Sequence, residues 1–264
     1  MSIAAPLHAL ALWRTLVRQD LAVRYRGTLL GRLWPLLLPA IMLGVYGFVF
    51  GAVFKARWPG LAEGDKLGFA LNLFAGLLVH AMLVETVGQA PTALLRNANF
   101  VRKLVFPLPV LVGVPLGGAL VTGGIGLALV VVANAIWGSG LHLSALAAPL
   151  VLLPYLGVLF GLSLAFAALG VYVRDLGQIA AALMTLALFT STVLFPREMV
   201  PDALVHVVVL NPISFPVDSL RQAVLLGVWP DWSDLIGYSV VAWLAVAVGW
   251  RCFDRLRPGF ADVL

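Results

Sequence analysis

The chain has 264 residues, of which 62% are hydrophobic and 11% charged, and its mean hydropathy is +1.02. About a quarter of the residues of an ordinary soluble domain are charged, so this chain lacks the polar residues needed to cover a water-facing surface. The composition excludes a soluble globular domain and predicts an integral membrane protein. In such a protein the net charge of +5 bears on orientation in the bilayer, and we expect no nucleic-acid partner.

The N-terminal segment, residues 7–26, is neither a span nor a loop. Charged residues interrupt it too often for a bilayer core, yet Leu10, Trp13, Val17 and Leu21 fall on one side of a helix by their spacing. We therefore expect an amphipathic helix in the headgroup layer, in contact with membrane lipid. The first thirteen residues contain no Lys or Arg and no small-residue cleavage site, so a removable signal peptide is not expected.

Three arginines, Arg24, Arg26 and Arg32, flank Gly27 and Gly31 directly before the first apolar stretch. A guanidinium group matches phosphate oxygens in a two-point geometry, so these side chains are candidates to hold a phosphate-bearing headgroup. Ordinary anchoring by positive charges at the cytoplasmic surface explains them equally well. We assign the interfacial helix and the basic segment to about residues 7–31.

Six apolar stretches follow, each close to the roughly 20 residues that cross a hydrocarbon core of about 30 Å. They cover approximately residues 33–54, 67–90, 110–137, 147–173, 178–195 and 235–253. The predicted fold is therefore an all-α integral membrane protein with six transmembrane helices. No shift in composition divides the chain, so we expect a single transmembrane domain over residues 1–264.

The basic residues divide unevenly between the two sides that six spans define. Twelve lie on the side of both termini and five on the other, which accounts for all seventeen. The positive-inside rule puts the richer side in the cytoplasm. We expect a multi-pass protein with both termini cytoplasmic.

Residues 196–232, between the fifth and sixth spans, are the most irregular part of the sequence. Five prolines interrupt them, the run 203–210 is too short to cross a bilayer, and Asp218 and Arg221 interrupt the helix-like run 214–226. Short apolar helices broken by prolines suit a re-entrant hairpin, where protein or water satisfies the backbone. We predict two short re-entrant helices on the outer face.

The sequence offers little for catalysis or metal binding. The four histidines lie in different segments with no carboxylate or cysteine at ligand spacing, so no metal site is expected. The single cysteine, Cys252, excludes an internal disulfide. No GxxxxGK[ST] motif occurs, so the chain does not carry its own ATP-hydrolysing P-loop. Chemical energy, if it is used, must come from a partner.

Two features of the predicted spans are candidates for a functional role. Glu85 is the only carboxylate inside a span, and intramembrane charges are functional candidates by default, although Glu85 lies close enough to the inner end to reach the headgroup layer. Tyr46, Phe50 and Phe54 recur every four residues, with Trp34 at the start of the same span. They are a candidate conduit wall, but helix packing and interfacial belts use aromatic residues as readily and are the favoured interpretation.

Five motifs, taken together and in order, resemble a known family. They are DLAVRYRGTLLGRLW (20–34), NANFVRKLVFP (97–107), VRDLGQ (173–178), LNP (210–212) and RPGFADVL (257–264). The chain is similar, over almost its whole length, to the permease subunits of type-two ABC exporters that move polysaccharides of the O-antigen, capsule and teichoic-acid kinds.

The resemblance implies a fold and partners that the residues alone do not. It implies an interfacial N-terminal helix, six spans and outer re-entrant helices, in a homodimer with two copies of a cytoplasmic ABC ATPase subunit. The chain would hold no cofactor, since ATP and Mg are used by the ATPase. The cargo would be a lipid-linked glycan, exported across a bacterial inner membrane. The chain itself would be a transport subunit and not an enzyme.

The resemblance also implies roles for particular residues. A coupling helix that docks on the ATPase would contain Asn97, Asn99, Phe100, Arg102 and Lys103. Arg24, Arg26 and Arg32 would belong to the gate where the headgroup of the lipid-linked glycan enters. One departure is Leu38 before Pro39, where many relatives have a polar residue, and a role for polarity cannot be carried over to that position.

Two alternatives stay open. An ABC exporter of a drug or small lipid would have the same architecture and a different cargo. A membrane acyl- or glycosyltransferase would need an indispensable carboxylate beside a phosphate-binding arginine. Only Asp20 and Asp175 stand near basic residues on the inner side, and Arg174 with Asp175 is explained more simply as a tight turn.

Overall fold

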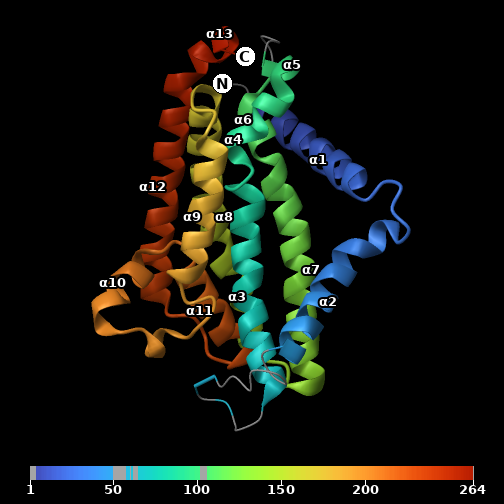
Figure 1. The fold of residues 1–264 in the computed structure, drawn as a ribbon, viewed down its shortest axis with the longest axis vertical. Coiled ribbons are helices and arrows are strands. Elements are labelled where there is room, and N and C mark those ends of the chain that lie inside the picture. Colours follow the sequence, from blue (N-terminus) through green and yellow to red (C-terminus); the bar gives the residue numbers. More distant parts are fainter. Residues whose placement is uncertain (1–3, 50–57, 60, 62–64, 102–105, 264) are drawn as a thin grey trace.

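The structure is a computed structural model that describes residues 4–49, 58–59, 61, 65–101 and 106–263. All regular elements within these residues are helices, which confirms the predicted all-α class. The long helical segments stand side by side as an upright bundle (Figure 1). They are α3 (Lys66–Thr86), α6 (Leu108–Val112) with α7 (Val114–Trp137), α8 (Ala148–Tyr172) and α12 (Trp232–Leu256).

Shorter helices surround this bundle. Those beside its long axis are α1 (Ala4–Arg24), η1 (Gly31–Leu33), α2 (Trp34–Tyr46) and α9 (Leu176–Phe189). Those in the connections and at the C-terminus are α4 (Ala90–Ala93), η3 (Leu95–Asn97), α5 (Ala98–Val101), η4 (Leu143–Ala147), η5 (Arg197–Met199), α10 (Asp202–Leu210), α11 (Ser214–Leu225), η6 (Arg257–Gly259) and α13 (Phe260–Val263).

Four of the predicted spans correspond to helices long and apolar enough to cross a membrane. Among the described residues these are Lys66–Ala93, Leu108–Trp137, Leu143–Tyr172 and Trp232–Val263, and the pair α10 and α11, bent by 91°, would make a fifth if it counts as one broken span. The first and fifth predicted spans form shorter apolar helices, Trp34–Val49 and Leu176–Phe189. The fifth therefore ends at Phe189 instead of 195, and residues 50–54 of the first lie outside the described residues.

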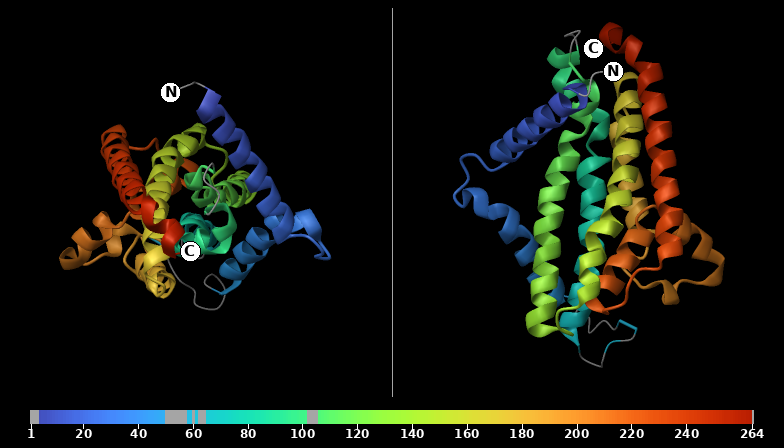
Figure 2. Two further views of the ribbon diagram at one scale, coloured as in Figure 1. Left: turned by 90° about the horizontal axis from the view of Figure 1, so that it is seen from above. Right: turned by 180° about the vertical axis from the view of Figure 1, so that it is seen from behind.

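The two ends of the bundle differ. The start of α1, the short helix α5 and the C-terminal α13 lie together at one end, here called the terminal end (Figure 1). The helices α10 and α11 and the start of α12 lie toward the other, here called the hairpin end. Viewed from behind, α1 and α2 lie on one side of the bundle, and the turn that joins them projects away from it (Figure 2). This turn uses Gly27 and Gly31 at φ values of 78° and 48°, which suit glycine.

The helix α1 packs on the bundle through one side. The indole nitrogen of Trp13 donates a hydrogen bond of 2.7 Å to the carbonyl of Gly113, and Val17 is buried against Gly117, where a Cβ would collide with it. Trp13 and Val17, which were expected to face lipid, thus pack against the protein, whereas Leu10 of the same predicted side is 43% exposed.

Close backbone contact holds α8 against α12. A side chain at Gly249 of α12 would collide with the backbone of Gly161 in α8, so both positions require glycine. Elsewhere in the core the fully buried Tyr155 of α8 donates a hydrogen bond of 2.8 Å to the carbonyl of Val79 in α3. Small residues that let backbones approach are the usual means of packing helices in a bilayer.

Candidate functional site

A charged cluster joins α1 to two bundle helices toward the terminal end. Arg24, the last residue of α1, forms an ion pair with Glu85 of α3 and a second one, of 2.8 Å, with Asp20 one turn earlier. Glu85 also accepts a hydrogen bond of 3.0 Å from the hydroxyl of Thr122 in α7. Gly118 of α7 leaves the room for this arrangement, because a Cβ there would lie 2.8 Å from Glu85 Oε1. The cluster fixes the C-terminal end of α1 against α3 and α7.

The charge of Arg24 is stable in this cluster. Burial would lower the pKa of its guanidinium, but the hydrogen bond and negative charge of Glu85, aided by Asp20, raise the pKa above its ordinary value. Arg24 is therefore a permanent cation. Since both of its carboxylate partners come from this chain, its guanidinium is engaged within the fold.

The other two predicted gate residues have different surroundings. Arg26 is exposed in the turn that follows α1. Arg32 belongs to η1, just before α2, and its side chain lies outside the described part of the structure. The basic segment thus divides into Arg24, which is paired with the partly buried carboxylate of Glu85, and Arg26, on the surface of a projecting turn.

The segment predicted to couple to an ATPase lies at the terminal end. The side-chain amide of Asn97, the last residue of η3, donates a hydrogen bond of 2.9 Å to the carbonyl of Ala93, the last residue of α4. Asn99 is exposed on α5. Phe100 belongs to α5 but its side chain is not described, and Arg102 and Lys103 lie outside the described residues. What the structure does describe of this segment is short helical turns between α3 and α6.

The candidate conduit wall is only partly described. Tyr46 packs against the cluster of Trp58, Phe69 and Leu73 at the hairpin end. Within the described residues the buried indole nitrogen of Trp34 has no hydrogen-bond partner. Phe50 and Phe54 lie outside the described residues. The described contacts of Tyr46 are packing contacts, and the role of the stripe stays a prediction.

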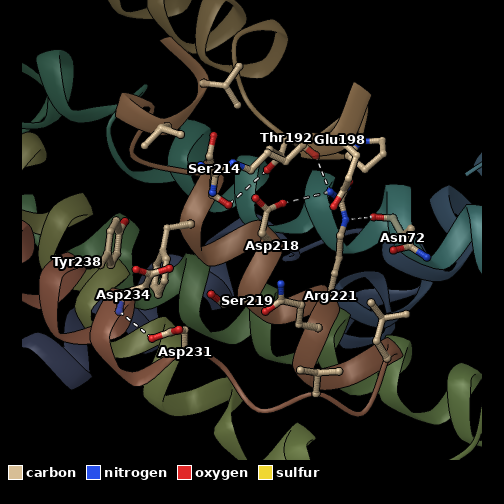
Figure 3. A pocket seen from close by; sticks show the side chains of 18 of the residues that line it. Asn72, Thr192, Glu198, Ser214, Asp218, Ser219, Arg221, Asp231, Asp234 and Tyr238 are labelled. Carbon is tan, nitrogen blue, oxygen red and sulfur yellow. Dashed lines mark hydrogen bonds and ion pairs between the residues drawn. The ribbon is translucent and has the colours of Figure 1, made fainter. Parts of the chain in front are cut away.

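A large cavity opens at the hairpin end, and sequence reasoning did not identify it. Its volume is about 1110 Å³, and its walls come from the break after α9, from α10 and α11, and from the first turns of α12 (Figure 3). We call it the hairpin cavity. A second cavity, of about 460 Å³, lies between α2, α3 and α7 and is lined mainly by apolar residues.

Arg221 holds α11 in place beside the hairpin cavity. It is only 4% exposed. Its guanidinium donates three hydrogen bonds to carbonyl oxygens, of 2.8 Å to Asn72, 2.5 Å to Thr192 and 2.7 Å to Val193. It also lies 4.5 Å from the ring centre of Trp58 and forms an ion pair of 3.8 Å with Asp218. The side chain thus connects α11 to α3 and to the segment after α9.

These contacts explain why α9 ends early. The chain leaves the helix at Thr190, and the carbonyls that follow have no helical partner. Arg221 satisfies two of them, and the side-chain amide of Asn211, from the LNP motif, donates to the carbonyl of Ala187 at 2.9 Å and to the hydroxyl of Thr190 at 3.0 Å. Non-helical backbone at membrane depth needs such partners from the protein. Arg221 is one of the five basic residues that the sequence count assigns to the outer side, and the structure shows that it is buried and not a surface charge.

The remaining polar residues of the hairpin cavity are mainly acidic. Glu198, Asp218, Asp231 and Asp234 line it. Asp231 caps α12 by accepting hydrogen bonds from the backbone of Ser233 (2.8 Å) and Asp234 (3.3 Å) and from the Ser233 hydroxyl (2.6 Å), and these lower the pKa of its carboxyl group. Over the part of the chain that the structure describes, no group of three or more His, Cys, Asp or Glu residues could hold a metal ion.

The helical architecture, with its apolar spans, broken hairpin and short turns at the terminal end, is that of a multi-pass membrane protein. Comparison with known families is more specific. The family model "ABC-2 type transporter" matches residues 11–225, so the chain belongs to the ABC-2 type transporter family. This confirms the resemblance drawn from the five motifs.

Individual relatives cover nearly the whole chain. The chain is 24% identical to an O-antigen export system permease protein RfbA of Klebsiella pneumoniae and 27% identical to one of Myxococcus xanthus. Each alignment covers 94% of this chain and 93% of the relative. The chain is accordingly a transport subunit. Of the two carboxylates considered for an enzyme, Asp20 pairs with Arg24, and Asp175 lies in the turn before α9.

Proposed function

We propose that this chain is the permease subunit of an ATP-driven exporter that moves a lipid-linked polysaccharide from the cytoplasm to the outer side of a bacterial inner membrane. The observation that carries the proposal is the alignment of 94% of the chain with O-antigen export permeases from two bacteria. A match of that extent includes the spans, the hairpin and the turns at the terminal end.

The proposed orientation has the terminal end in the cytoplasm. Arg96, Arg174, Arg255 and Arg257 belong to turns and helix ends there. At the hairpin end Arg221 is buried and bonded to backbone carbonyls, so it adds little surface charge. The difference in basic surface residues between the two ends is therefore larger than the count of twelve against five from the sequence. It agrees with the positive-inside rule for a cytoplasmic terminal end.

The proposed energy source is a separate ABC ATPase, present in two copies on a homodimer of this chain. Its docking site would be the turns η3 and α5 with the following residues, up to Lys103. ATP and Mg would be bound by that partner. Closure of the ATPase would move these turns, and the shift would reach α1 because Arg24 ties α1 to Glu85 in α3, the helix that precedes the docking turns.

The proposed entrance for the glycan lipid is the turn between α1 and α2. Arg26 is exposed there and suits the phosphate of a lipid carrier, and Arg32 follows in η1. Arg24 would contribute by fixing the position of the turn rather than by direct contact.

A cellular experiment tests this function. The gene would be deleted in its host, and export would be measured as glycan on the cell surface after complementation with the permease and its ATPase. We expect surface glycan with the intact pair and none with an ATPase whose P-loop lysine is replaced. Export that persists with the inactive ATPase, or glycan that is unaffected by the deletion while a drug or small lipid accumulates in the cell, would refute the proposal.

A further inference from the structure

The hairpin cavity has a lining that the proposed export steps do not use. Its volume of about 1110 Å³ lies above the roughly 300–1,000 Å³ typical of pockets for small molecules. The cavity is therefore large enough for several rings of an oligosaccharide. Its walls come from the break after α9, α10, α11 and the start of α12 (Figure 3).

The lining of the hairpin cavity contains more acidic than basic side chains. Four carboxylates, Glu198, Asp218, Asp231 and Asp234, line the cavity, and Arg197 and Arg221 are the basic residues in its described lining. Arg221 directs its guanidinium at backbone carbonyls. A phosphate headgroup or an acidic sugar would meet net negative charge here. Ionised carboxylates act only as hydrogen-bond acceptors, so they suit ligands rich in donors, such as hydroxyl or ammonium groups.

Aromatic rings supply the second kind of surface that sugars need. Phe215 and Tyr238 line the cavity and stack on each other with ring centres 4.7 Å apart. Trp229 also lines it, is 50% exposed and stacks on Trp232. Flat apolar faces beside hydrogen-bond acceptors are a usual composition for a site that orients a small polar ligand.

We propose that the hairpin cavity is a binding site for neutral or amine-bearing sugar units. Its carboxylates accept hydrogen bonds from the sugar, and Trp229 offers a stacking face. That these sugars are part of the exported glycan rests on the proposed function. Under that proposal the cavity holds the glycan at the outer face after it has crossed the bilayer.

Binding of defined trisaccharides to the purified permease with its ATPase, in lipid nanodiscs, tests the inference. The probes are a neutral N-acetylglucosamine trimer, a glucosamine trimer and a galacturonic acid trimer, with binding measured by calorimetry and by saturation-transfer NMR. We expect the neutral and amine trimers to bind and the acidic trimer not to bind. Equal binding of all three, or binding of the acidic trimer alone, would overturn the proposal.

Asp234→Asn adds a test of charge. Asp234 is exposed on the cavity wall, so its neutralisation should weaken binding of the glucosamine trimer more than binding of the neutral trimer.

Export assays separate the cavity site from the proposed export function. Normal export by a permease that binds none of the trimers would refute the cavity site and leave the proposed function standing, whereas trimer binding without any glycan export would do the reverse.

Discussion

Replacing Arg221 by methionine removes the side chain that joins α11 to α3 and to the break after α9. Three charge-assisted hydrogen bonds to carbonyls are lost, each with an energy of about 1.5–3 kcal/mol. The variant also no longer buries a cation, which offsets part of that loss. Removing one partner of a buried charged network has a net effect of about 3–5 kcal/mol, and we expect a loss of stability in that range.

The measurement is thermal unfolding of the purified permease in nanodiscs. For a chain of this size a loss of about 3–5 kcal/mol corresponds to a fall in Tm of roughly 6–20 °C. The control is Arg197→Met, because Arg197 lines the same cavity but is exposed, and its Tm should change little. If Arg221→Met unfolded at the same temperature as Arg197→Met, the assignment of Arg221 as the support of the hairpin would be refuted.

Three further predictions concern other parts of the fold. A double-mutant cycle of Arg24→Gln and Glu85→Gln, followed by thermal unfolding, should give a coupling energy of about 1–3 kcal/mol, and additive effects would exclude the ion pair. Gly249→Ala should lower Tm, because a Cβ at this position meets the backbone of α8. The control Gly237→Ala lies in the same helix with nothing within 4 Å of its Cβ and should leave Tm unchanged. Equal Tm values for the two variants would contradict the close packing of α8 and α12. The folded-state pKa of Asp231 is depressed, so its cap is fully present above the ordinary carboxyl pKa and is lost as the pH falls through the lower folded value. The protection factors of the amides at the start of α12, which are exchange rates corrected for the intrinsic effect of pH, should therefore fall in acid in the wild type. They should not change with pH in this way in Asp231→Ala.

The class and outline of the fold follow from the sequence because they depend on local properties. Apolar stretches of bilayer length became helices, and prolines marked the broken hairpin. The spacing of Trp13 and Val17 indicated an apolar side of α1, which was expected to face lipid and packs on the bundle instead. The motif RPGFADVL formed the short C-terminal helices, where Phe260 is buried beside Phe253. Each of these features is encoded within a few turns of helix.

The contacts of charged residues were not predictable in the same way. Hydropathy and charge counts treat every arginine as a surface charge, yet Arg221 and Arg24 are committed to partners far away in sequence. Pairing Arg24 with Glu85 needs the tertiary fold, because no local spacing connects them. The clue for Arg221 was its presence in an otherwise apolar, helix-like run just after a proline-rich break, where unsatisfied carbonyls need a donor.

Reconstitution into proteoliposomes tests the central claim most directly. The permease and its ATPase would be inserted into liposomes that contain a lipid-linked glycan labelled in the leaflet facing the ATPase, and the glycan would be measured in the opposite leaflet. We predict transfer that requires ATP, the ATPase and the permease together. Transfer without ATP, or no transfer of the glycan by a complex that hydrolyses ATP and is correctly folded, would contradict the account.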